Sequence, residues 1–95
     1  MNTLLEEFFD LSERLFMTLR EGRIPKDELI DSVVKAIDGL AKEFYDDKSL
    51  PKELVAVMLD MSTALYSSAD GHSEPARSDL YKKFDIVTDK MRDLC

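Results

Sequence analysis

Aspartate and glutamate supply most of the side chains in this 95-residue chain that could do chemistry. Glu6, Asp10 and Glu13 are spaced at i, i+4 and i+7, which places three carboxylates on one face of a helix. No basic residue precedes Arg14, so nothing interrupts this ridge. Like charges at this spacing repel by roughly a few tenths of a kcal/mol per pair, a cost that a cation from outside can offset. The ridge indicates recognition of a basic partner; a solvated helix face is the alternative.

Two further acidic groups are less regular. Asp46 and Asp47 follow Glu43 at the expected end of the second helix, where the helix dipole disfavours acids. Acids in an unfavourable position favour use by an outside partner. A ridge on the last helix, interspersed with basic residues, consists of Asp85, Asp89 and Asp93.

The third helix has one polar face that is nearly uncharged, with Asp60 as the sole ionised group between Glu53 and Asp70. Such a face favours burial beneath the other helices. If the face is exposed instead, Asp60 and Tyr66 beside nearby methionines would suit the centre of an interface. The face consists of Glu53, Ala56, Asp60, Thr63 and Ser67.

The residues that catalysis or metal binding requires are scarce. His72 is the one histidine and lies in a polar stretch, and Cys95 is the one cysteine. A zinc site needs three or four such ligands in most cases, and nucleophilic catalysis needs a nucleophile held beside a base. Neither a Glu-x-x-His pair nor a phosphate-binding glycine loop occurs. We therefore expect that the protein is not an enzyme and that it has no cofactor and no metal site.

Charge and composition limit the possible partners. The formal net charge is -7, with 44% hydrophobic and 35% charged residues, which suits one folded domain spanning residues 1–95. The negative charge argues against direct binding of nucleic acid and of an anionic membrane surface. No uncharged run approaches the ~20 residues of a membrane span. The first residues lack the positively charged start of a secretory signal. A single cysteine is typical of a protein in a reducing compartment. We expect a cytoplasmic protein.

Helical spacing of apolar residues predicts four helices, over residues 3–21, 25–46, 50–67 and 74–94. Thr3 and Glu6 have the spacing of a capping box, and we expect Gly22 to end the first helix. No segment has the period of a strand. Because the connections are short, we predict an all-α fold, a single-domain antiparallel four-helix bundle.

Residues that favour helix starts and turns mark the remaining boundaries. Pro25 and Pro51 are expected in the first turns of the second and third helices. The stretch 67–75 contains Asp70-Gly71 and three serines, which predicts the longest loop, with Ser73 as the candidate cap of the last helix.

The start of the third helix reads Ser49-Leu50-Pro51-Lys52-Glu53-Leu54. Together with the acidic chain of this length and the polar loop before a final amphipathic helix, it resembles the small helical immunity proteins of bacterial nuclease toxins, of the type paired with colicin D and some contact-dependent inhibition toxins. The resemblance implies a four-helix bundle whose acidic surface occupies the basic, RNA-binding active site of the toxin.

The residues lead to the same hypothesis, because a blocker of a basic cleft should place carboxylates where phosphates would lie. We expect an inhibitor of a basic protein partner, a toxin nuclease domain. A homo-oligomeric scaffold is the alternative, in which the apolar stripe of the first helix packs on a twin chain; both monomer and homodimer remain open. The predicted partner-binding residues are Glu6, Glu7, Asp10, Glu13, Asp46, Asp47, Asp60 and Tyr66.

Overall fold

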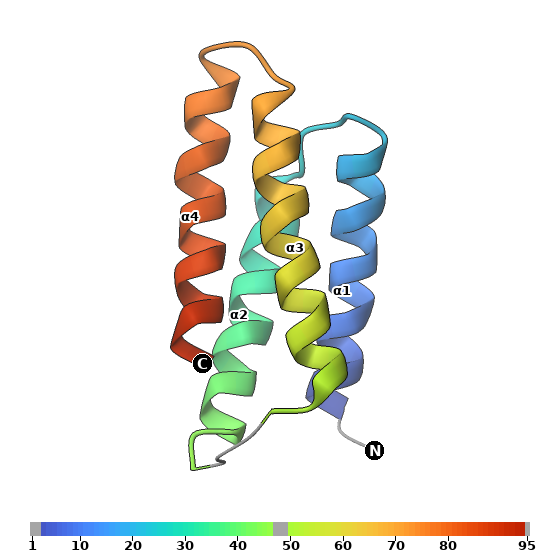
Figure 1. The fold of residues 1–95 in the computed structure, drawn as a ribbon, viewed down its shortest axis with the longest axis vertical. Coiled ribbons are helices and arrows are strands. Elements are labelled where there is room, and N and C mark those ends of the chain that lie inside the picture. Colours follow the sequence, from blue (N-terminus) through green and yellow to red (C-terminus); the bar gives the residue numbers. More distant parts are fainter. Residues whose placement is uncertain (1–2, 47–49, 95) are drawn as a thin grey trace.

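Apolar side chains at helical spacing form four helices in the computed structural model, which describes residues 3–46 and 50–94 (Figure 1). They are α1 (Thr3–Arg20), α2 (Asp27–Glu43), α3 (Lys52–Asp70) and α4 (Ala76–Leu94). No strand occurs within these described ranges. The prediction of an all-α, four-helix fold is confirmed.

The end of α1 follows the sequence prediction. Gly22 has φ +75°, a left-handed conformation that glycine adopts without a steric penalty. Its amide donates to the carbonyl of Leu19 over 3.0 Å, and the amide of Arg23 donates to the carbonyl of Thr18 over 3.1 Å. These two bonds form a Schellman motif, which satisfies two of the carbonyls left without partners at a helix end.

The two prolines precede their helices rather than occupying the first turns. Lys26 is the N-cap of α2 with extended backbone, and Pro25 before it is buried. Pro51 is itself the N-cap of α3. Both helices therefore begin two residues later than predicted. Asp27 and Glu28 still occupy the first turn of α2, where the helix dipole favours acids.

The connection between α3 and α4 is shorter than the sequence suggested. Ala69 is fully buried and continues the apolar stripe of α3 beyond the expected end at Ser67, so the helix reaches Asp70. Ser73 does not supply the side-chain cap that was predicted for α4. The carboxylate of Glu74 does so instead, accepting a 2.9 Å hydrogen bond from the amide of Ser78 and another from its hydroxyl.

Consecutive helices run in opposite directions, but their order around the bundle is not sequential (Figure 1). α1 packs against α2 and α3, and α4 packs against the same two helices. Within the described ranges the backbones of α2 and α3 do not approach each other closely, so these two helices lie across the diagonal. The eight residues 44–51 span at most about 27 Å when extended, enough to cross a bundle whose shorter dimensions are 21 and 20 Å. The antiparallel arrangement expected from the short connections therefore holds for α1–α2 and α3–α4, whereas the neighbours α1 and α3 are parallel, as are α2 and α4.

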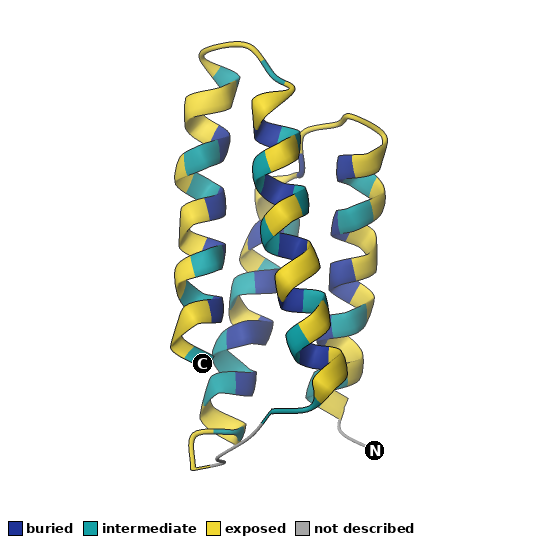
Figure 2. Ribbon diagram, viewed as in Figure 1, coloured by how far each residue is buried: buried dark blue, intermediate teal, exposed yellow. Residues whose placement is uncertain are grey.

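Each helix turns one apolar stripe to a common core (Figure 2). Ser12 is the buried polar residue of α1, and its hydroxyl donates a 2.7 Å hydrogen bond to the carbonyl of Phe8. In the described part of the chain, no buried side-chain nitrogen or oxygen atom is left without a hydrogen-bond partner. Its largest fully buried members are Phe8, Leu15, Val33, Ile37, Leu40, Leu54, Met61, Leu65, Leu80, Phe84 and Val87.

Candidate functional site

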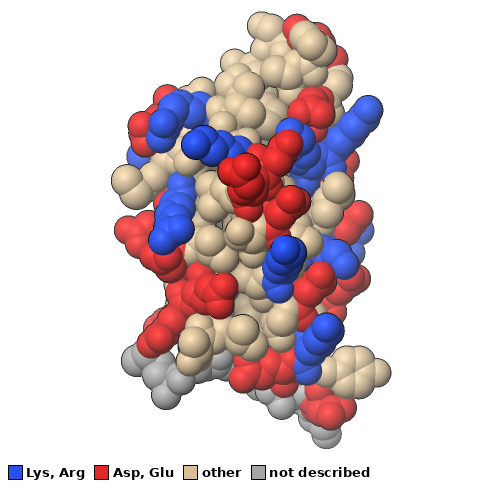
Figure 3. All heavy atoms as spheres, turned by 180° about the vertical axis from the view of Figure 1, so that it is seen from behind, with Lys and Arg blue, Asp and Glu red and all other residues tan. Residues whose placement is uncertain are grey.

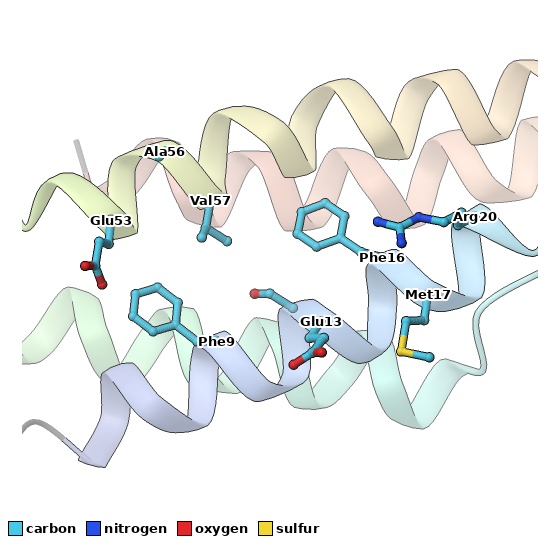
Figure 4. A pocket seen from close by; sticks show the side chains of 9 residues that line it. Phe9, Glu13, Phe16, Met17, Arg20, Glu53, Ala56 and Val57 are labelled. Atoms are coloured by element: carbon cyan, nitrogen blue, oxygen red, sulfur yellow. The ribbon is translucent and has the colours of Figure 1, made fainter.

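A groove of about 620 Å³ runs between the parallel helices α1 and α3 (Figure 4). Phe9 and Phe16 extend from α1 toward α3, and Val57 extends from α3 into the space between them. All three are only partly buried. The groove is lined by Phe9, Ser12, Glu13, Phe16, Met17, Arg20, Glu53, Ala56 and Val57.

The apolar floor of the groove arises because the stripe of α1 is wider than the core requires. Phe8 and Leu15 are fully buried in the bundle, whereas Phe9 and Phe16 each follow one position later and are rotated toward α3. Met17 adds a flexible side chain that is 53% exposed. Aromatic residues and methionine at a partly exposed position are typical of protein interfaces.

Charged side chains border this floor unevenly. Glu53 lies at one end beside Phe9, Glu13 lies on the α1 side, and Arg20 lies at the other end beside Phe16 (Figure 4). Across residues 3–46 and 50–94, none of these three side chains forms an ion pair. Their charges remain available to a ligand in the groove.

The predicted acidic ridge of α1 is exposed but only partly free. Glu6, Glu7, Asp10 and Glu13 are all exposed. A carboxylate oxygen of Asp10 lies 3.0 Å from a guanidinium nitrogen of Arg14, one turn later. The three other acids have no ion-pair partner in the described part of the chain. Glu13 is among the predicted partner-binding residues, whereas Glu53 was expected only as a member of the polar face of the third helix, although both line the same groove.

The polar face of α3 is exposed, so the expectation that it would be buried is wrong (Figure 2). The buried stripe of α3 lies on another side of the helix, at Leu54, Met58 and Met61 and onward to Ala69. Asp60 is exposed on the same face as Glu53 and Ala56, and Leu59 beside it is 67% exposed. This surface is continuous with the groove, because Glu53 and Ala56 belong to both.

Tyr66 is half-buried and faces α4, where its hydroxyl serves the fold. It donates a 2.6 Å hydrogen bond to Asp85 and lies 3.0 Å from the hydroxyl of Thr88. Its ring stacks on Tyr81 with centroids 5.7 Å apart, and the Tyr81 hydroxyl donates to Asp70. The bond to Asp85 raises the pKa of Tyr66, and the bond to Asp70 raises the pKa of Tyr81.

The acidic group after α2 lies at the end of the bundle, away from the groove. Asp46 is exposed in the turn that follows the helix, and Asp47 lies outside the described residues. A shallow depression there also includes Asp93 at the end of α4 and the side chain of Tyr45, which is 84% exposed. The predicted binding residues therefore occupy three separate surfaces rather than one.

Lysines of α4 neutralise acids along its contact with α2. Lys83 lies 2.6 Å from Asp27 and 3.0 Å from Asp79, and the bond to Asp27 is the main reason that the pKa of Lys83 is raised. Lys90 lies 3.2 Å from Asp38. Figure 3 shows this rear view of the molecule, in which acidic and basic side chains are interspersed. A uniformly acidic surface is absent from that view.

The described residues contain no cluster of three or more histidine, cysteine or acidic side chains arranged to hold a metal ion. His72 is half-buried in the connection between α3 and α4, and Cys95 lies outside the described residues. Within the same ranges, none of the helices has the length and apolar character needed to cross a membrane.

Comparison of the chain with protein-family models, with curated proteins and with solved structures finds no match.

Proposed function

We propose that this protein binds and inhibits a basic protein partner, and that it is an immunity protein that blocks a bacterial nuclease toxin in the cytoplasm. The observation that carries the proposal is the combination of a partly exposed apolar floor at Phe9 and Phe16 with carboxylates at Glu13 and Glu53 that no cation of the described chain neutralises. An apolar centre provides affinity, and surrounding charges accelerate encounter with an oppositely charged surface.

Nuclease active sites provide a cationic surface of the required kind, since they must hold phosphate groups. Glu6, Glu13, Glu53 and Asp60 would approach such a surface from the α1 and α3 side. The net charge of -7 adds long-range attraction that weakens as salt screens it. In this proposal Asp46 belongs to a second, peripheral contact, and Tyr66 holds α4 in place rather than touching the partner.

The alternative function, a homo-oligomeric scaffold, requires an exposed apolar stripe on α1, and less of that stripe is exposed than this function needs. Phe8 and Leu11 belong to the apolar stripe of α1 that would pack on a twin chain, but both are buried in the chain's own core. Phe9 and Phe16 remain partly exposed. Light scattering on the purified chain distinguishes the two functions, because a scaffold is a stable oligomer at micromolar concentration and the proposed inhibitor is a monomer before it meets its partner.

The inhibitor function is tested by growth rescue. Each reading frame that flanks the gene is expressed from an inducible promoter in a bacterial host, with and without this chain. We expect one product to arrest growth, the arrest to be relieved by this chain, and the two purified proteins to form a complex that lacks nuclease activity. If no flanking product is toxic, or if a toxic one is not relieved, the immunity function is wrong.

A further inference from the structure

The shape of the α1–α3 groove suits the binding of one additional helix. It lies between two parallel helices, and it is open to solvent along Phe9, Val57 and Phe16 (Figure 4). Ala56 lines one side with a single methyl group, which permits close approach of a ligand backbone. A helix that rests on two others normally buries an apolar stripe in such a space.

The charges at the groove give it a direction. Glu53 borders the end that lies nearer the N-terminal ends of α1 and α3, and Arg20 borders the opposite end (Figure 4). Glu13 lies between them on the α1 side. A complementary helix places lysine or arginine near the two glutamates and an acid near Arg20. A helix is stabilised by acids near its N-terminus and by bases near its C-terminus, so the complementary ligand runs antiparallel to α1 and α3.

We propose that the groove binds an amphipathic helix of the partner protein, with an apolar stripe on Phe9, Phe16 and Val57, basic residues beside Glu13 and Glu53, and an acid beside Arg20. This inference rests on the proposed function, since it names the segment through which the basic partner is recognised.

A second copy of this chain fits the groove less well than a basic helix. A two-fold pairing would bring Arg20 of one copy to the acidic half of the other, which is favourable. The face nevertheless carries Glu6, Glu13, Glu53 and Asp60 against Arg20 and Lys52. Two copies would therefore bury unneutralised acids against each other, in addition to the repulsion between two chains of charge -7.

The inference is tested with a probe peptide of roughly 18 residues, about five helical turns. The peptide carries leucines and one tryptophan along one stripe, glutamates in its N-terminal half and lysines in its C-terminal half. A control peptide has the same composition in scrambled order. The chain contains no tryptophan, so tryptophan fluorescence reports on the peptide alone.

We expect saturable binding of the probe and none of the scrambled peptide. The double substitution Glu13→Gln with Glu53→Gln should weaken binding about tenfold, equivalent to about 1.4 kcal/mol. The matched control, Glu28→Gln with Asp31→Asn, changes the net charge equally at two exposed positions of α2 and should leave binding within about twofold of the wild type. Circular dichroism establishes that both variants are folded.

The direction of the ligand is tested with a second peptide in which the glutamates are replaced by glutamine. We expect this change to weaken binding to the wild type, and to have no effect on binding to the Arg20→Gln variant, because the charge that the glutamates meet is then absent. Equal loss in both proteins contradicts the assigned direction.

The results separate the groove from the wider function. Absence of probe binding, or equal effects of the groove and control substitutions, overturns the groove assignment. Dimerisation of the chain that Glu53→Gln or Arg20→Gln abolishes would identify a second copy as the occupant and also overturn it. If growth rescue succeeds while the groove substitutions leave rescue and complex affinity unchanged, the inhibitor function stands and the groove inference is wrong.

Discussion

The hydroxyl of Tyr66 on α3 donates a 2.6 Å hydrogen bond to the carboxylate of Asp85 on α4. This bond favours the protonated tyrosine in the folded state and raises its pKa above the usual value of about 10. A group whose pKa is raised on folding contributes stability that is complete below its unfolded pKa. That contribution is lost as the pH rises through the folded pKa.

We therefore predict that the free energy of unfolding decreases as the pH rises above about 10. Tyr66→Phe should lower the stability near neutral pH by about 0.5–1.5 kcal/mol, the usual net contribution of a hydrogen bond. It should also make the alkaline decrease smaller. Tyr81 and Lys83 also have raised pKa values, so some decrease remains in the variant. Urea denaturation at several pH values measures the effect, and identical pH profiles for the two proteins would contradict it.

Glu13 and Asp10 should affect a complex differently. Both neutralisations, Glu13→Gln and Asp10→Asn, remove one negative charge and should slow association similarly at low salt. Asp10 is already paired with Arg14, whereas Glu13 lines the groove without an ion pair in the described chain. We expect Glu13→Gln to raise the dissociation rate constant about three- to tenfold and Asp10→Asn to raise it less than about twofold. Stopped-flow and surface plasmon resonance measurements with the identified partner provide both constants, and a larger effect of Asp10→Asn on dissociation would refute the distinction.

Two leucines of α3 provide a matched test of the bundle. Leu65 is fully buried, and Leu59 is 67% exposed on the same helix. Leu65→Ala should lower the free energy of unfolding by about 2–5 kcal/mol, because it removes core contacts and leaves a cavity. Leu59→Ala should change it by less than about 0.5 kcal/mol. Comparable losses in chemical denaturation would show that the side of α3 facing the core has been wrongly assigned.

Two glycines should respond in opposite directions to alanine. A methyl group at Gly39, inside α2, would meet Leu4 at 3.6 Å, an ordinary van der Waals distance. Gly39→Ala should therefore stabilise the protein by about 0.5–1 kcal/mol through helix propensity. Gly22→Ala should destabilise it by about 1 kcal/mol or more, because an L side chain disfavours the left-handed conformation there. Thermal unfolding compares the two variants, and the assignment fails if both shift the midpoint the same way.

The four helices could be predicted from the sequence because each of the four segments has apolar residues at helical spacing. The end of α1 could be predicted because Gly22 adopts the left-handed conformation without a steric penalty. It was less informative about helix starts. Proline is compatible both with a first turn and with the extended residue before it, so Pro25 and Pro51 do not fix the boundary. The side-chain cap of α4 could not be predicted, because it depends on the position of the Glu74 carboxylate relative to the amide of Ser78.

The α1–α3 groove could not be predicted from single helices. Its two glutamates come from different helices, and the order of helices around the bundle, with α2 and α3 on the diagonal, is not encoded in local periodicity. One signal was present: Phe9 and Phe16 make the apolar stripe of α1 broader than one core-facing row. The uncharged face of α3 was wrongly expected to be buried, because low charge suits an interface as well as a core. The partner-binding residues themselves stay predictions.

The diagonal placement of α2 and α3 also divides the chain into two antiparallel helical hairpins, α1–α2 and α3–α4, that meet through the parallel contacts α1–α3 and α2–α4. Neither hairpin can cover its own apolar side. Fragments corresponding to the two halves should each be largely unstructured in isolation and should regain helicity when mixed, so that the protein behaves as a natural pair of complementing fragments joined in one chain.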